Sequence, residues 1–279
     1  MERIKQAIEK VKKGNTSRSS SRTDSHLDSK DAKSQRVIQT IDELGEIHYE
    51  HTRVVKLRAE HLRTTRIVAF DKNDAMSMRF DLLRTHVLHK MEENGWRTLA
   101  ITSPAQEAGK TVVAINLAMS IAQQTNKTAM LVDFDLRRPK VGAYLGIPME
   151  RSLNDLLDGT AELSEVLVNP DIPGLVVLAT KTPVKKPAET LSSKKISELI
   201  KDLRVRYKSR IVIFDLPPVL VADDTIALLP QIDCVLMVVA NGMSTKREIE
   251  DSIRLLPADN LIGTVLNKAD TESTGYYYY

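Results

Sequence analysis

Six short apolar runs recur between residues 97 and 267, and their regular spacing constrains the fold more than any other feature of the sequence. The runs cover residues 97–103, 127–134, 174–180, 210–216, 234–240 and 261–267. Each run is apolar on successive residues and is followed by a helix-like stretch or a loop. Strands that are apolar on both faces are typical of parallel sheets with helices on either side. The sequence therefore predicts a doubly wound α/β fold with a mostly parallel sheet and a ligand at the carboxyl ends of its strands.

A candidate phosphate-binding loop follows the first run, in the stretch ITSPAQEAGKTVVAINLA. In such loops the backbone N–H groups surround the phosphates, a lysine reaches the β- and γ-phosphate oxygens, and a hydroxyl binds Mg²⁺. Lys110 and Thr111 have the side chains that these roles need. We expect Gly109, Lys110, Thr111 and Val112 to bind the nucleotide, with Thr111 also a metal ligand.

The loop departs from the usual pattern at two positions. Pro104 stands where the pattern has its first glycine, and Glu107 stands where such loops often carry another. A residue with a side chain has less backbone freedom than glycine, and a carboxylate at Glu107 opposes bound phosphates. These changes predict slow catalysis, or nucleotide binding without catalysis.

Carboxylates stand at the ends of two further apolar runs. Asp133 and Asp135 close the run 127–134, and the alternation of side chains along a strand places both on one face. Asp215 ends the run 210–216, in the manner of a Walker B aspartate. Because Mg²⁺ prefers oxygen ligands, the sequence predicts a magnesium site formed by Thr111, Asp135 and Asp215.

The base of the nucleotide has a candidate ligand after the last run. Asn267, Lys268, Ala269 and Asp270 match the NKxD pattern with which GTPases recognise guanine. An asparagine at this place can equally bind adenine, so the pattern leaves both ATP and GTP open. We expect Asn267 to bind the nucleotide in either case.

The remaining segments are interpreted from their composition and periodicity. An amphipathic pattern predicts a helix over residues 74–95, with Met78, Leu82, Val87 and Met91 among its apolar positions. The sequence as a whole predicts an amphipathic helix at 1–14, a flexible polar linker at 15–35, an adaptor segment with a short helix at 36–75, a P-loop domain at 76–270 and a tyrosine-rich tail at 271–279.

Composition narrows the setting in which the protein works. The formal net charge of +3 is nearly balanced and does not favour a nucleic-acid partner. The single cysteine, Cys234, lies in an apolar run and is interpreted as a buried structural thiol. No apolar stretch approaches the ~18 residues that a membrane-spanning helix needs, so we expect a cytoplasmic protein.

With these motifs placed, the chain resembles the bacterial tyrosine kinases of exopolysaccharide and capsule synthesis, from about residue 66 to its end. The matching stretches are LLRTHVL, LAITSP followed by GKTVVAINLA, LVDFDLRRPKVGAYLGI, PAETL, RIVIFDLPPVLVADD and GTVLN, with the tyrosine tail after them. The DxDxR of Asp133, Asp135 and Arg137 resembles the Walker A′ motif of that family.

The resemblance implies an ATP- and Mg²⁺-dependent protein-tyrosine autokinase on a MinD/ParA-like P-loop NTPase fold with a helical N-terminal extension. A neighbouring copy would phosphorylate the tail in trans, at Tyr276, Tyr277, Tyr278 and Tyr279. The implied partners are an inner-membrane chain-length or co-polymerase protein as activator, further copies of the chain, and a phosphotyrosine phosphatase. The protein would then lie in the cytoplasm, peripheral to the inner membrane through its partner.

The resemblance also assigns roles to the candidate residues. Lys110 would bind the β- and γ-phosphates, Asp135 and Asp215 would hold Mg²⁺, and Asp133 would orient or deprotonate the incoming tyrosine. Arg137 and Arg138 could neutralise charge in the transition state, or they could equally be surface residues. Because phosphotyrosines are strongly anionic, several of them would repel one another and the acidic site, which would release the tail.

Two alternatives remain open at this point. A degenerate loop favours a nucleotide-binding scaffold of a polysaccharide export complex with weak or no catalysis. A partitioning ATPase of the MinD/ParA class is the other, although such proteins carry a lysine where this chain has Ala105. The family's Glu-x-x-Arg-x-x-Arg subunit-contact motif falls on Met78, Asp81 and Arg84, of which only Arg84 matches.

Overall fold

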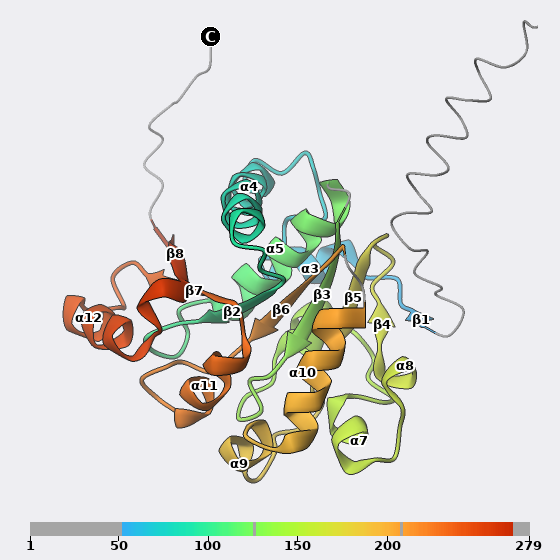
Figure 1. The fold of residues 1–279 in the computed structure, drawn as a ribbon. Helices are drawn as coiled ribbons and strands as arrows, with labels where there is room; N and C mark the ends of the chain where they lie inside the picture. Colours follow the sequence, from blue (N-terminus) through green and yellow to red (C-terminus); the bar gives the residue numbers. More distant parts are fainter. Residues whose placement is uncertain (1–51, 125–126, 207–208, 270–279) are drawn as a thin grey trace, which may run out of the picture. The chain divides into compact units, whose positions relative to one another are not determined.

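A computed structural model of the chain describes residues 52–124, 127–206 and 209–269, which contain a sheet of eight strands (Figure 1). Its spatial order is β1-β4-β5-β3-β6-β2-β7-β8, and all neighbouring pairs are parallel except β4 and β5. The strands are β1 (Arg53–Val54), β2 (Thr98–Thr102), β3 (Thr128–Asp133), β4 (Val168–Asn169), β5 (Leu175–Leu178), β6 (Arg210–Asp215), β7 (Cys234–Ala240) and β8 (Leu261–Asn267). The expected amphipathic helix at 1–14, the linker at 15–35, the first part of the adaptor segment and the tail tyrosines lie outside the described residues.

The six strands predicted from the apolar runs are confirmed, and so is the mostly parallel α/β architecture. The structure adds β1 and β4, each of two residues. A two-residue strand is too short for a periodic pattern, which is why the sequence did not indicate them.

Helices cover both faces of the sheet. They are α3 (Ala59–Thr64), α4 (Ser77–Glu93), α5 (Lys110–Gln124), α6 (Val141–Leu145), α7 (Leu153–Asp158), α8 (Leu163–Val166), α9 (Pro187–Leu191), α10 (Lys194–Arg206), α11 (Asp223–Leu228) and α12 (Lys246–Leu255), with 3₁₀ turns at Leu229–Gln231 and Ala258–Asn260. Successive residues of β3 enter opposite cores: Leu131 packs with α4, α5 and α6, and Met130 and Val132 pack with α10 and α11. The fold is therefore doubly wound.

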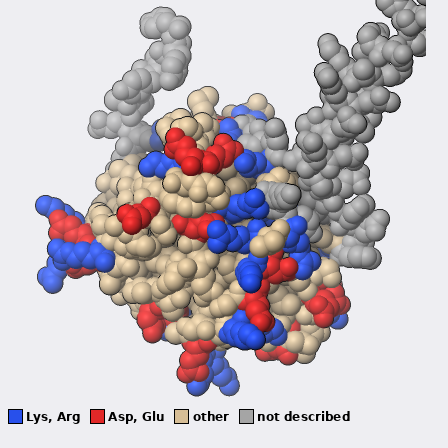
Figure 2. All heavy atoms as spheres, viewed as in Figure 1, with Lys and Arg blue, Asp and Glu red and all other residues tan. Residues whose placement is uncertain are grey.

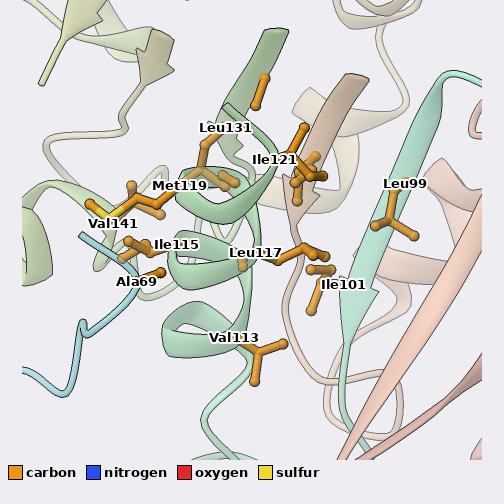
Figure 3. Packing of buried hydrophobic residues seen from close by; sticks show 14 of the residues in the cluster. Ala69, Leu99, Ile101, Val113, Ile115, Leu117, Met119, Ile121, Leu131 and Val141 are labelled. Carbon is orange, nitrogen blue, oxygen red and sulfur yellow. The ribbon is translucent and has the colours of Figure 1, made fainter. Parts of the chain in front are cut away.

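Helix α5, which begins at the phosphate-loop lysine, is buried on several sides (Figure 3). Figure 3 shows Leu117 directed toward Ile101 of the sheet, while Ile115 lies on the side of Ala69 and Val141. All of these side chains are fully buried. Packing on opposite sides fixes the helix, and with it the position of Lys110 at its first turn.

Helix α4 confirms the helix predicted at 74–95, but two of its apolar residues face solvent. Val87 and Met91 are buried against α5, whereas the exposed fractions of Met78 and Leu82 are 74% and 61%. The prediction counted all four among the apolar positions of an amphipathic helix. The buried residues of α4 are instead Ser77, Val87, Leu88 and Met91.

Residues 52–75 belong to the same sheet and core as the rest of the described chain. Strand β1 pairs with β4, and Leu62, Ile67 and Ala69 are buried in the core beside α5. The short helix expected in the adaptor segment is α3. The domain boundary expected at residue 76 therefore has core residues on both sides of it.

On the face shown in Figure 2, Lys and Arg side chains are intermixed with Asp and Glu, in keeping with the nearly balanced net charge. None of the helices in the described ranges has the length and apolar character to cross a bilayer.

Candidate nucleotide site

The predicted nucleotide residues meet where β2, β3 and β6 end and α5 begins. Lys110 Nζ lies 2.7 Å from Asp135 Oδ2 and 3.5 Å from Asp215 Oδ1. Burial lowers the pKa of the Lys110 ammonium, but the carboxylates of Asp215 and Asp135 more than offset this and the pKa is raised. Lys110 therefore stays charged and neutralises part of a buried acidic cluster.

Asp215 is fully buried and only half satisfied. Its Oδ2 accepts a 2.6 Å hydrogen bond from Thr111 Oγ1. Its Oδ1 has no hydrogen-bond donor among the described residues, since Lys110 Nζ at 3.5 Å is too distant for a good bond. Burial raises the pKa of Asp215, although Lys110 and Thr111 oppose that rise. A buried carboxylate oxygen without a donor is suited to a cation.

Magnesium fits the residues gathered here. Asp215, Asp135 and Thr111 supply two carboxylates and a hydroxyl, and Mg²⁺ commonly uses one or two carboxylates together with water and phosphate oxygens. Within the described ranges no group of three or more His, Cys, Asp and Glu side chains is arranged as a complete metal site. The arrangement thus suits an ion that a nucleotide brings with it.

Asp133, the expected partner of a tyrosine hydroxyl, is fully buried and bonded to backbone. Its Oδ2 accepts from the amides of Lys140 at 3.1 Å and Val141 at 3.0 Å, and its Oδ1 accepts from the amide of Asp135 at 3.3 Å. Burial, followed by the nearby carboxylate of Asp215, raises the pKa of Asp133 well above its ordinary value. In this conformation Asp133 organises the loop after β3, and a hydroxyl reaches it only if that loop moves.

Arg137 is held by an acid that the sequence analysis did not single out. Its Nε donates to Asp224 Oδ2 at 2.6 Å and its Nη2 donates to Asp224 Oδ1 at 3.0 Å. Asp224 is fully buried, whereas Asp223 lies 3.8 Å from Arg137 and is exposed. The hydrogen-bonded carboxylate of Asp224 raises the pKa of Arg137. The only signal in the sequence was the acid pair after the run 210–216.

Asn267 lies against the phosphate loop. Its Nδ2 donates to the carbonyl of Ala108 at 2.8 Å. A Cβ at position 109 would come within 2.1 Å of that same nitrogen, and Gly109 has a φ of 90°, so only glycine fits there. Asn267 thus positions the loop through its amide nitrogen.

Glu107 adopts the left-handed backbone conformation, with a φ of 64°, and its side chain is exposed. This is the position where the usual loop has glycine, which takes that conformation without strain. The chain therefore keeps the loop conformation of a glycine with a residue that disfavours it.

The predicted site residues line one cavity of 1530 Å³. Those at its wall are Gly109, Lys110, Thr111, Val112, Asp135, Arg137 and Asn267. Asp133 and Asp215 lie behind them, fully buried. The structure thus brings together every site residue expected from the sequence, apart from the tail tyrosines outside the described ranges.

The expected subunit-contact positions are used within the chain. Arg84 donates to Asp81 at 3.0 Å and to Ser120 Oγ at 3.2 Å, and Ser120 in turn donates to Asp81 at 2.6 Å. Met78 is exposed. These contacts join α4 to α5.

Comparison with known proteins finds relatives of this chain among tyrosine-protein kinases. The chain is 31% identical over 183 residues to the tyrosine-protein kinase CpsD of Streptococcus pneumoniae, covering 64% of this chain and 79% of that protein. It is 30% identical over 197 residues to the tyrosine-protein kinase Ptk of Acinetobacter johnsonii, covering 70% of this chain and 26% of that protein. The chain therefore spans about a quarter of the length of the first curated relatives it matches. No protein-family model matches it.

Solved structures agree with these relatives. The kinase domain of the Escherichia coli tyrosine kinase ETK has a TM-score of 0.68 and 25% identity, covering 86% of this chain and 97% of that one. The cell division ATPase MinD of Pyrococcus furiosus has a TM-score of 0.52 and 21% identity, covering 62% of this chain and 74% of that one. The second similarity supports the P-loop NTPase fold alone.

Proposed function

Because the chain belongs to the bacterial tyrosine-protein kinases, we propose that it transfers the γ-phosphoryl group of ATP to the tail tyrosines, Tyr276 to Tyr279, of a neighbouring copy. The observation that carries this proposal is the half-satisfied Asp215, buried beside Thr111 and Lys110 at the start of α5. Those groups supply a metal ligand, a hydroxyl and a cation where a nucleotide phosphate would meet the helix N-terminus.

Phosphoryl transfer needs positioning and charge neutralisation from these residues. Lys110 would exchange its contact with Asp135 for the phosphate oxygens, which would leave Asp135, Asp215 and Thr111 to hold Mg²⁺. The ion would draw negative charge from the phosphates and orient them for in-line attack. Arg137, oriented by Asp224, would add positive charge at the same wall of the cavity.

The reaction balances with groups on this chain. The tyrosine oxygen forms a bond to the γ-phosphorus, the bond from that phosphorus to its bridging oxygen breaks, and ADP leaves with the electron pair. We propose the ionised carboxylate of Asp133 as the acceptor of the phenolic proton, since burial raises the pKa of Asp133 and makes this carboxylate a stronger base. Its burial requires the loop 134–141 to open when the acceptor tyrosine enters.

The cellular setting follows from the resemblance and is part of the same proposal. It comprises capsule or exopolysaccharide synthesis, an inner-membrane co-polymerase as activator, and a phosphotyrosine phosphatase that hydrolyses the phosphate from the tail. The chain would work in the cytoplasm, next to the membrane protein that activates it.

Glu107 favours a second candidate, a nucleotide-binding scaffold with weak catalysis. Its left-handed conformation carries a cost of roughly 1–3 kcal/mol, and its carboxylate stands near the phosphates. In that case ATP binds, and the bound state itself is the signal to a partner.

Incubation of the full chain with Mg·ATP, followed by mass spectrometry of the peptide 270–279, tests both candidates. We expect phosphate on the tyrosines, and none in a Lys110→Met variant that retains its fold by circular dichroism. Nucleotide binding without any phosphotyrosine would favour the scaffold. Failure to bind nucleotide in calorimetry would refute both.

A further inference from the structure

The cavity at the nucleotide site is larger than one small molecule needs. Its volume of 1530 Å³ exceeds the roughly 300–1,000 Å³ of ordinary small-molecule sites. Beyond the phosphate loop the lining includes Arg66, Arg79, Lys140 and Lys185. A second occupant therefore has room beside the nucleotide.

The outer part of this lining is cationic. Arg66, Arg79, Lys140 and Lys185 are exposed, and within the described ranges none of their side chains makes an ion pair or hydrogen bond. By contrast, Lys110 and Arg137 are already paired with buried carboxylates. The outer cations are thus available to an anion, and a nucleotide held at Lys110 leaves them unused.

Buried hydrogen bonds hold the turn that carries Arg66 in place. Asn116 of α5 is fully buried, and its Oδ1 accepts from the amides of Val68 at 2.8 Å and Ala69 at 2.9 Å. Its Nδ2 donates to the carbonyls of Arg66 at 3.1 Å and Val112 at 2.9 Å. One amide therefore fixes the Arg66 turn to the helix that starts at Lys110.

Hydrogen bonds also join the segments that carry Lys140 and Lys185 to their neighbours. The amide of Val184 donates to the carbonyl of Leu136 at 2.9 Å, which places Lys185 beside the loop that carries Lys140. Thr65 Oγ1 donates to the carbonyl of Tyr144 at 2.9 Å, which joins the Arg66 turn to α6. These contacts join the segments that carry Arg66, Lys140 and Lys185, and all three residues line the same cavity.

We propose that Arg66, Arg79, Lys140 and Lys185 bind a phosphotyrosine already present on the tail of a neighbouring copy, while the next tyrosine of that tail is phosphorylated. This inference rests on the proposed kinase function and names how the substrate is retained. A phosphotyrosine carries about −1.5 to −2 charges and pairs well with Arg and Lys. Binding of the phosphotyrosine by these four cations revises the expectation that phosphorylation simply releases the tail.

The charge of the substrate segment is complementary to that of the four cations. Residues 270–279 include Asp270 and Glu272 and no Lys or Arg. The four tyrosines are consecutive, so a phosphotyrosine two residues from the acceptor is at most about 7 Å away along the chain. One tail can therefore present an acceptor to the nucleotide and a phosphate to these cations in the same cavity.

Peptide binding without nucleotide tests the inference separately from catalysis. The probe is a fluorescent peptide of residues 270–279, unmodified or phosphorylated at Tyr278, added to the full chain with its four tail tyrosines changed to Phe. We expect the phosphorylated peptide to bind about tenfold more tightly in fluorescence anisotropy. Combined Arg66→Gln, Arg79→Gln, Lys140→Gln and Lys185→Gln substitutions should bring this preference close to one.

A matched control removes the same charge elsewhere. Lys56, Arg58, Lys181 and Lys201 are exposed and do not line the cavity, and changing all four to Gln should keep the preference. No preference in the parent chain, a preference that survives the cavity substitutions, or equal loss in both variants would overturn the inference. Absence of phosphotyrosine in the Mg·ATP assay would instead count against the kinase function, since this binding assay needs no transfer.

Discussion

Two buried aspartates at opposite edges of the sheet have opposite environments. Asp215, at the carboxyl end of β6, has one oxygen bonded to Thr111 and the other without a donor. Asp233, directly before β7, accepts from the amides of Arg97 at 2.8 Å and Thr98 at 3.0 Å, and it pairs with Arg204 at 2.7 Å. Asp233 is therefore fully satisfied by its own chain, and Asp215 is not.

The difference separates a structural carboxylate from one suited to a ligand. Satisfied buried acids stabilise the fold, because removal of one leaves donors unpaired. An unsatisfied acid costs folding free energy that a bound cation recovers. The carboxyl edge of this sheet thus keeps a buried acidic cluster that Lys110 neutralises only in part.

The largest expected effect is on Asp215 itself. Asp215→Asn should lower Mg²⁺-dependent nucleotide affinity by roughly 10- to 100-fold, because the metal loses a charged ligand. The free energy of unfolding without nucleotide should not fall by more than about 1 kcal/mol, because the native acid already carries a desolvation cost. Calorimetric titration and urea denaturation measure the two effects. Unchanged nucleotide affinity would remove Asp215 from the site.

Acid should weaken the same interaction. Because burial raises the pKa of Asp215, the native carboxyl takes up a proton at higher pH than the ~3.9 of a solvated aspartate, and Mg²⁺ must displace that proton. Nucleotide affinity in Mg²⁺ should fall as the pH is lowered through the native pKa, by up to about tenfold per pH unit.

The free energy of unfolding without ligand should gain a contribution from Asp215 as the pH is lowered, whereas nucleotide affinity falls. The native state holds the Asp215 proton more tightly than the unfolded state, so this group stabilises the fold at low pH and the contribution is lost as pH rises through the native pKa. Asp215→Asn should remove that part of the pH dependence. A nucleotide affinity that is flat over this range would contradict the assignment.

Asp224 borders the candidate site through Arg137, and both of its carboxylate oxygens accept hydrogen bonds from that residue. It therefore tests whether an acid with its hydrogen bonds satisfied still affects the reaction. Asp224→Asn should lower kcat/KM about tenfold through loss of Arg137 orientation, while Asp223→Asn, which removes an exposed acid, should change it less than about twofold. Steady-state assays of tail phosphorylation compare the two. Equal effects would mean that the bidentate contact does not position Arg137.

At the amino edge the effect should be on stability alone. Asp233→Asn should lower the free energy of unfolding by roughly 1–2 kcal/mol, since Arg204 loses its partner and the backbone amides lose a charged acceptor. Nucleotide affinity of the folded variant should equal that of the parent. A loss of affinity without a loss of stability would show that the two edges are not separable in this way.

The smallest effect is expected at Glu107. Glu107→Gly should speed tail phosphorylation a few-fold, because it relieves the left-handed conformation and removes a carboxylate near the phosphates. Glu107→Gln, which removes the charge and keeps the strain, divides the gain between the two causes. A slower Gly variant would show that Glu107 assists the reaction.

The sequence indicated the edge of the sheet where the candidate site lies, but not the contacts that complete this site. Strong local patterns marked Lys110, Asp135 and Asp215, because each belongs to an apolar strand or to the loop that follows one. The partner of Arg137 and the contact of Asn267 with the phosphate loop join residues 87 and 159 positions apart, and no local pattern encodes such pairs.

Helix α4 shows the same limit in the core. Its periodicity predicted the helix correctly, yet Met78 and Leu82 face solvent while Val87 and Met91 are buried in the core. Burial depends on which neighbour lies opposite, and that is a property of the assembled fold. The mismatch at the subunit-contact positions was visible in the sequence, whereas the bonds of Asp81 and Arg84 to α5 were not.

A mixture of two variants tests transfer between copies most directly. One chain carries Lys110→Met with an intact tail, and the other has an intact site with Tyr276–Tyr279 changed to Phe. After incubation with Mg·ATP, intact mass spectrometry should find phosphate on the tail of the Lys110→Met chain, which has no competent site of its own. Phosphotyrosine on the parent chain alone, with none on the Lys110→Met chain in the mixture, would contradict transfer in trans.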